Sequence, residues 1–111
     1  MIEKIVMDYL ADKLSCPVVM EVPADPAARF VLLEKTGSGR SGPLKKAALA
    51  IQSYAESLYE TALLNDEVKA VMEDITDLDI ICRAELNSDY NFTDTAAKRY
   101  RYQAVFDLIH Y

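Results

Sequence analysis

Residues 29–59 read RFVLLEKTGSGRSGPLKKAALAIQSYAESLY, and this stretch contains the clearest pattern of secondary structure in the chain. An apolar run at its start gives way to a glycine-rich segment, then a second apolar run leads into a helical pattern. Three glycines, two serines and a proline lie between Thr36 and Pro43, so the chain can bend there but cannot bury anything by itself. The stretch predicts a strand, a flexible loop, a second strand and a helix.

The two apolar runs are predicted to be strands from Phe30 to Lys35 and from Leu44 to Tyr54. An alternative for the second run is a helix that begins after its proline, a position where proline is favoured. The strand is the preferred interpretation because Leu49 and Ile51 alternate with smaller or polar residues. Ser53 would then be a suitable N-cap for the helix that follows.

The segment before this stretch predicts one helix and one short strand. Apolar residues from Ile2 to Leu14 recur at helical spacing, with charged residues on the opposite side. That helix should stop near Ser15, because Pro17 disfavours helical geometry in the residue before it. The sequence VVMEV at 18–22 is a short strand candidate.

The segment after the stretch predicts a long helix from Tyr54 to about Ile75. The polar pair Asn65 and Asp66 interrupts its apolar stripe, so one continuous helix and two abutting helices both fit. The predicted stripe consists of Leu58, Ala62, Val68, Met72 and Ile75.

Two further strands are predicted toward the end of the chain, from Leu78 to Leu86 and from Arg99 to Tyr111. A turn-rich connection, SDYNFTD at 88–94, joins them. In the first strand the predicted inward side chains are Ile80, Cys82, Ala84 and Leu86.

These elements give a single α+β domain over the 111 residues, with the order α-β-β-β-α-β-β. The sheet is expected to be mostly antiparallel, with both helices packed on one face.

A net charge of −6 argues against general attraction to nucleic acid or anionic membranes. Cys16 and Cys82 fit no metal or redox spacing and are expected to be reduced thiols of a cytoplasmic protein, with Cys82 in the core. No signal peptide and no membrane span are expected.

No catalytic, cofactor-binding or metal-binding residues are assigned. The segment GSGRSG lacks the lysine and the serine or threonine of a phosphate-binding loop, and it is expected to lead into a strand instead of a helix. The single histidine, His110, is expected to be a terminal strand residue and not a base for a nucleophile. Four carboxylates are expected to form a solvated acidic end and not a cation site: Glu73, Asp74, Asp77 and Asp79.

Charge is distributed unevenly along the chain. From Arg29 to Lys46 there are five basic residues and one acid, whereas from Glu56 to Asp79 there are eight acids and one base. A basic hairpin and an acidic helix on one small domain could meet across a subunit boundary and close a ring. Two separately solvated surfaces explain the same charges equally well. Tyr9, Tyr54, Tyr59 and Tyr90 are expected to be exposed, as interface tyrosines often are.

Three segments together resemble the tail terminator (tail completion) proteins of long-tailed phages and prophages. They are VPADPAARFVLLEKTGSG at 22–39, ALAIQSYAESLYETALLNDEVKAVM at 48–72 and RYRYQAVFDL at 99–108. The chain departs from the family pattern where a serine separates Gly37 from Gly39 and where Tyr54 replaces a tryptophan. The family's motif positions correspond here to Pro23, Pro26, Phe30, Val31, Thr36, Gly37, Tyr54, Ala55, Ser57 and Ala62.

The resemblance implies a structural protein and not an enzyme. Family members are small α+β domains that form a ring, usually a hexamer, which caps the tail tube and offers the capped tail to the head connector. A head-completion or stopper protein and a small dimeric ligand-binding regulatory domain are the alternatives. Charge and loop composition, and not the family, select the expected assembly residues: Arg29, Lys35, Gly37, Ser38, Gly39, Arg40, Ser41, Gly42, Lys45 and Lys46.

Overall fold

The computed structural model describes residues 1–111 and confirms the predicted α+β fold and element order. Two helices, five strands and one short 3-10 helix follow the chain in the predicted sequence of helix and strand. Their bounds are α1 Ile2–Lys13, β1 Val18–Val19, β2 Phe30–Ser41, β3 Leu44–Tyr54, α2 Leu58–Glu73, η1 Ile75–Asp77, β4 Ile81–Asn91 and β5 Arg101–His110.

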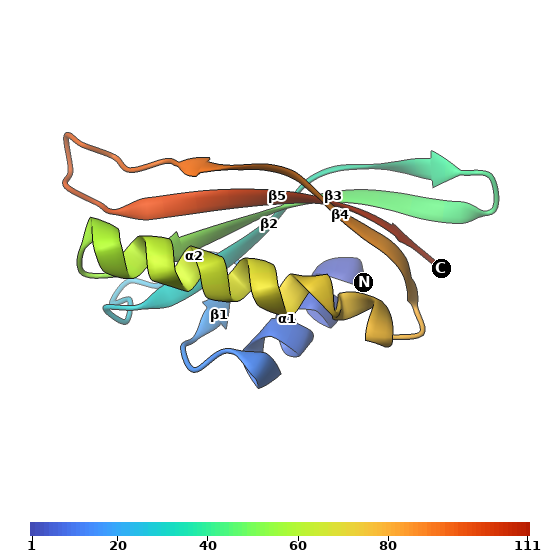
Figure 1. Ribbon diagram of the computed structural model, residues 1–111, viewed down its shortest axis with the longest axis horizontal. Coiled ribbons are helices and arrows are strands. Elements are labelled where there is room, and N and C mark those ends of the chain that lie inside the picture. Colours follow the sequence, from blue (N-terminus) through green and yellow to red (C-terminus); the bar gives the residue numbers. More distant parts are fainter.

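The five strands form one twisted sheet in the order β1-β2-β3-β5-β4. All neighbouring strands are antiparallel except β1 and β2, which are parallel. Both helices lie on the same side of this sheet and leave its other face without a covering layer (Figure 1). The β2–β3 hairpin extends past the helices at one end of the molecule, where both chain termini also lie (Figure 1).

The hydrophobic core lies between the helices and the covered face of the sheet. Leu49 and Ile51 of the central strand β3 are fully buried, as their alternation in the sequence predicts. They meet Val6 and Leu10 of α1 and Val68 of α2 within one cluster of buried side chains. One core of this size is what a chain of this length can form.

The glycine-rich segment is a strand and not the predicted flexible loop. β2 continues through Ser41, so only Gly42 and Pro43 turn the chain before β3 begins. A bulge at Thr36, between the pairs that Lys35 and Gly37 make, shifts the register and lets pairing continue. Glycine and serine permit a bend but do not prevent pairing with a long partner strand, and β3 supplies that partner.

The start of α2 corrects the predicted N-cap. Ser53 is fully buried in β3, where strand pairing continues to Tyr54, and Ser57 caps the helix instead. The Ser57 Oγ atom accepts a hydrogen bond of 3.1 Å from the Glu60 backbone N–H. β3 has a neighbouring strand on each side, and because it pairs with both, the strand continues through Ser53 and ends at Tyr54.

The buried stripe of α2 differs from the predicted stripe in its first half. Leu58 is 41% exposed and Ala62 is half-buried, whereas Thr61, Leu64 and Asn65 are buried. Val68, Met72 and Ile75 are buried as predicted. α2 is one continuous helix through Asn65, so residues three, four or seven positions before Val68 lie on the same buried face. Thr61, Leu64 and Asn65 have this spacing, whereas Leu58 and Ala62 do not.

Strand β4 begins and ends three to five residues later than predicted, at Ile81 and Asn91. Cys82 is exposed and not in the core, because a bulge between Ile81 and Arg83 removes it from the regular alternation. Leu86 is also exposed, since β4 is an edge strand. The other thiol, Cys16, is half-buried, and burial raises its pKa above the usual value.

Three other boundaries also differ from the sequence predictions. Of the predicted strand at 18–22, only Val18–Val19 pairs, because a proline-containing segment follows before Phe30. The predicted turn at 88–94 is strand up to Asn91, so the connection to β5 covers 92–100. β5 begins at Arg101 and not at Arg99, and it ends at His110, which is a terminal strand residue as predicted and is also buried.

Candidate functional site

The candidate site is the end of the β2–β3 hairpin, residues 35–46, which we call the arm. Its turn is Gly42-Pro43, in which Gly42 has a φ of 61°. Glycine with positive φ at the first turn position is the usual solution for a tight hairpin. Except for half-buried Gly37, Ser41 and Leu44, the arm residues are exposed. The two strands of the arm pair with each other, and its β3 strand also pairs with β5 as far as Lys45, which is opposite His110.

The basic side chains of the arm lie on both faces of the hairpin. Arg40 is directly opposite Lys45 in the register, so these two cations share one face. Lys46 is opposite Gly39 on the other face. Like charges directly opposite each other destabilise a strand pair. None of these three side chains forms an ion pair within the chain.

A concavity lies where the arm meets the helical side of the molecule. Its volume is about 320 Å³, and Glu3 and Lys35 lie at its base, with 3.8 Å between the Glu3 Oε1 and Lys35 Nζ atoms. Arg40, Lys45 and His110 also line it. With Lys46, which also lines it, four Lys and Arg side chains against one carboxylate make this hollow basic, although the protein as a whole is acidic.

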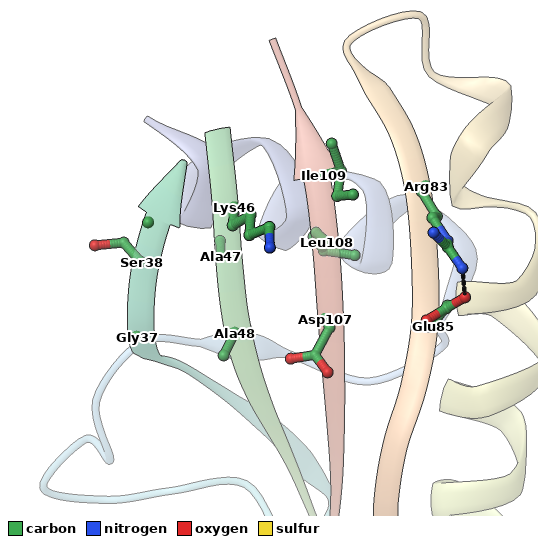
Figure 2. A pocket seen from close by; sticks show the side chains of 11 residues that line it. Gly37, Ser38, Lys46, Ala47, Ala48, Arg83, Glu85, Asp107, Leu108 and Ile109 are labelled. Carbon is green, nitrogen blue, oxygen red and sulfur yellow. Dashed lines mark hydrogen bonds and ion pairs between the residues drawn. The ribbon is translucent and has the colours of Figure 1, made fainter. Parts of the chain in front are cut away.

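A second concavity, of about 430 Å³, lies on the uncovered face of the sheet. It is hollow because Gly37 and Gly39 have no side chains where the arm leaves the sheet. Figure 2 shows Lys46 and Asp107 on the neighbouring strands β3 and β5, and an ion pair between Arg83 and Glu85 on β4. The hollow therefore contains two cations and two carboxylates, and it has no strong preference for either sign of charge.

Nine of the ten residues selected from the sequence lie together on the arm, and Arg29 does not. Arg29 precedes the opposite end of β2, where its Nη2 atom lies 3.7 Å from the Glu60 Oε2 atom of α2. At this one pair the basic and acidic segments meet within the chain. Sequence reasoning missed Arg83, Glu85 and Asp107, because only the β3–β5–β4 pairing brings them beside the arm.

The acidic segment presents an exposed side of α2 that we call the outer face. Tyr59 is 71% exposed and Leu63 is 39% exposed, and both lie on the same side of the helix as Glu67, Glu73 and Asp74, which caps its C-terminal end. These three carboxylates form no ion pair within the chain.

Four tyrosines are predicted from the sequence to be exposed. Tyr59 and Tyr90 are exposed, whereas Tyr9 is half-buried and Tyr54 is buried.

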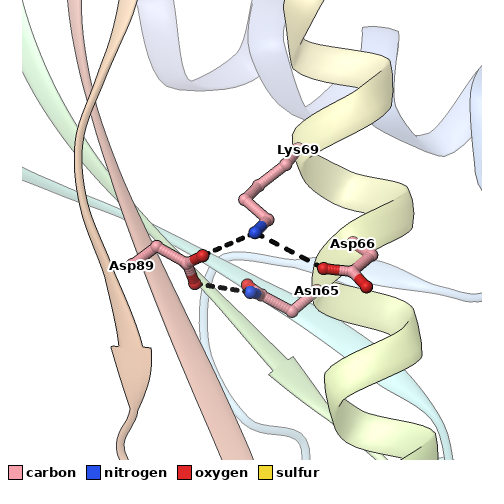
Figure 3. A network of polar contacts seen from close by, with 4 residues as sticks. All are labelled: Asn65, Asp66, Lys69 and Asp89. Atoms are coloured by element: carbon pink, nitrogen blue, oxygen red, sulfur yellow. Dashed lines mark hydrogen bonds and ion pairs between the residues drawn. The ribbon is translucent and has the colours of Figure 1, made fainter.

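The inner side of α2 is joined to β4 by a polar network, shown in Figure 3. Asp89 accepts hydrogen bonds of 2.6 Å from Asn65 Nδ2 and 2.5 Å from Lys69 Nζ. Lys69 also lies 3.4 Å from a carboxylate oxygen of Asp66. The hydrogen bond with Asp89 is the largest cause that raises the pKa of Lys69 above its usual value. The network fixes the helix on the sheet and leaves the outer face free.

The nucleophiles and titratable groups do not form a reactive set. The ring of His110 is buried, and its Nδ1 atom lies 2.9 Å from the backbone oxygen of Tyr111 and not beside a serine or cysteine. No group of three or more His, Cys, Asp and Glu side chains is placed to hold a metal ion. No helix is long and apolar enough to cross a membrane.

The turn of the arm gives a test of its geometry. Gly42→Ala is expected to lower the free energy of unfolding by about 1–2 kcal/mol, because a side chain is strained at positive φ. Gly39→Ala is the matched control: its added methyl group meets nothing within 4 Å, and no positive φ is involved. Urea denaturation of both variants measures the difference. Equal stability of the two variants would contradict the observed turn.

No protein-family model matches this sequence, and no curated protein matches it either.

Proposed function

We propose that this protein is a structural tail terminator of a long-tailed phage or prophage. Protomers assemble into a ring, with six subunits as the expected number, which caps the tail tube and stops its polymerisation. The opposite side of the ring then offers a surface to the head connector or stopper protein. The protein would act in the host cytoplasm during assembly and afterwards in the tail and neck of the virion.

The observation that carries this proposal is the arm. A projecting hairpin with three exposed cations that form no ion pair in the chain is suited to contact with an acidic surface of another subunit, because complementary charges favour such contacts. The acidic outer face of α2 has the opposite charge and is also without partners. The resemblance of residues 22–39, 48–72 and 99–108 to tail terminators supplies the kind of assembly in which such surfaces are used.

The proposed mechanism is contact between surfaces and needs no catalytic step. One side of the ring matches the last ring of tube subunits, and the other side presents no site for a further tube subunit. Because the net charge is −6, DNA that passes the ring would be repelled by the overall charge of the protein. Sequence-specific binding to nucleic acid and binding to membranes are therefore not part of the proposal.

The proposal is tested with tail tubes and DNA-filled heads of the phage or prophage that encodes the chain. The purified protein is expected to bind one end of the tubes and to stop their growth in an elongation assay that contains free tube subunits. Binding to heads alone, with tubes that continue to grow, would show a stopper or head-completion protein instead. A protein that binds neither would leave the regulatory domain as the better explanation.

A further inference from the structure

The three cations of the arm are not paired with a carboxylate of their own protomer. Arg40 and Lys45 lie on one face of the hairpin and Lys46 on the other, and none of the three forms an ion pair. The hairpin extends beyond the helical layer (Figure 1). These exposed side chains are therefore open to carboxylates from outside the protomer.

Two arms cannot satisfy each other. A two-fold contact between arms would place Arg40, Lys45 and Lys46 of one protomer against the same cations of its partner, and like-charge contacts of this kind are costly. The partner surface must be acidic, and it must differ from the arm. A contact between two different surfaces of the same chain is heterologous, and it leads to a ring when the rotation between protomers closes.

The outer face of α2 meets these requirements. Glu67, Glu73 and Asp74 are exposed carboxylates that form no ion pair, and they equal the three cations of the arm in number and are opposite in sign. Tyr59 and Leu63 add exposed apolar area beside them. Tyrosine at the centre of a charged rim is a common anchor of protein interfaces. The other two acids of the helix, Glu60 and Asp66, are already paired with Arg29 and Lys69.

We propose that the arm of each protomer docks on the outer face of α2 of the next protomer, a second copy of this chain. Arg40 and Lys45, which share one face of the hairpin, lie opposite Glu67, Glu73 and Asp74, with Lys46 at the rim of the contact, and Tyr59 packs against the hairpin. This inference rests on the proposed ring, since it names the two surfaces that join its subunits. It leaves the uncovered face of the sheet free for other partners.

Charge reversal on each surface and on both together tests the contact. One triple variant carries Arg40→Glu, Lys45→Glu and Lys46→Glu, the other carries Glu67→Lys, Glu73→Lys and Asp74→Lys, and a third carries all six. The mass in solution is followed by sedimentation over a range of protein concentration at low salt. Each triple variant is expected to associate at least about tenfold more weakly than the unmodified protein. The variant with all six substitutions is expected to regain association.

The controls separate a lost contact from a lost fold or a changed net charge. All reversed residues are exposed, so circular dichroism is expected to be unchanged in each variant. Lys98→Glu and the pair Glu21→Lys with Asp25→Lys change exposed charges elsewhere and should leave association unchanged. Backbone amides of residues 37–43 are expected to exchange more slowly in the assembled protein than in the protomer.

The outcomes distinguish this inference from the function on which it rests. A ring that forms equally well with the arm reversed would overturn the docking of the arm and leave the tail-terminator proposal intact. A weakened arm variant that the α2 reversal does not rescue would mean that the acidic partner is another surface, which also overturns the inference. An unmodified protein that stays a protomer, with or without tail tubes, would overturn the proposed ring itself.

Discussion

Leu49→Ala is expected to lower the free energy of unfolding by about 3 kcal/mol, within the range of about 2–5 kcal/mol typical of buried leucines. Leu49 is fully buried in β3, the strand that has neighbours on both sides in the middle of the sheet. Its removal leaves a cavity between the sheet and the helices that the closely paired strands cannot close. A loss of this size is a large part of the stability of a small domain.

Leu86→Ala is the matched control for this prediction. Leu86 belongs to the same sheet, but it is 47% exposed on the edge strand β4. Its truncation is expected to cost less than about 1 kcal/mol, because much of the side chain is already in water. Urea denaturation at a concentration where the protein is a protomer measures both variants. Similar losses for the two leucines would mean that the core does not lie where the structure places it.

Asp89→Ala is expected to lower the free energy of unfolding by about 1–3 kcal/mol. The substitution removes the acceptor for Asn65 Nδ2, which is buried, and the main partner of Lys69. Asp66→Ala is the control, because Asp66 is largely exposed and its distance of 3.4 Å to Lys69 makes a weaker pair. The control is expected to lose less than about 0.5 kcal/mol. Equal losses would contradict the role given to Asp89.

The same network predicts that the unmodified protein and the Asp89→Ala variant differ in how their stability depends on alkaline pH. Because the pKa of Lys69 is raised in the folded protein, its contribution is fully present below the pKa of lysine in the unfolded chain and is lost as pH rises through the folded value. The unmodified protein should therefore lose stability more steeply above about pH 10.4 than Asp89→Ala does. Thermal denaturation from neutral to alkaline pH in both proteins measures this. Parallel curves would show that Lys69 is not held by Asp89.

The sequence predicts the elements of this fold better than it predicts their ends. The bounds of β3 are correct because the alternation around Leu49 and Ile51 reports a buried strand directly. The length of β2 could not be predicted, because glycine and serine are compatible with both a loop and a strand. The long partner strand decided between them. Likewise, Ser57 and not Ser53 caps α2 because strand pairing, which composition does not report, continues to Tyr54.

The cations of the candidate site could be predicted from the sequence, but their arrangement in space could not. The cations of the arm are consecutive or nearly so, and a charge count along the chain finds them. Their arrangement on two faces follows from the register that the two-residue turn Gly42-Pro43 sets between β2 and β3, which a charge count does not contain. Cys82 was misplaced because a bulge changes which side of a strand a residue faces. The partners Asn65 and Asp89 lie on different elements, and only the packing of α2 on β4 joins them.

The proposed ring, in which this chain assembles through its own surfaces, is tested by the mass of the protein in solution. Sedimentation equilibrium over a wide range of concentration is expected to show a protomer at low concentration and one defined ring, with six as the expected number of subunits, at high concentration. If charge pairing joins the subunits, added salt should shift the equilibrium back toward the protomer. A single mass equal to the protomer or to a dimer at every concentration would contradict the claim.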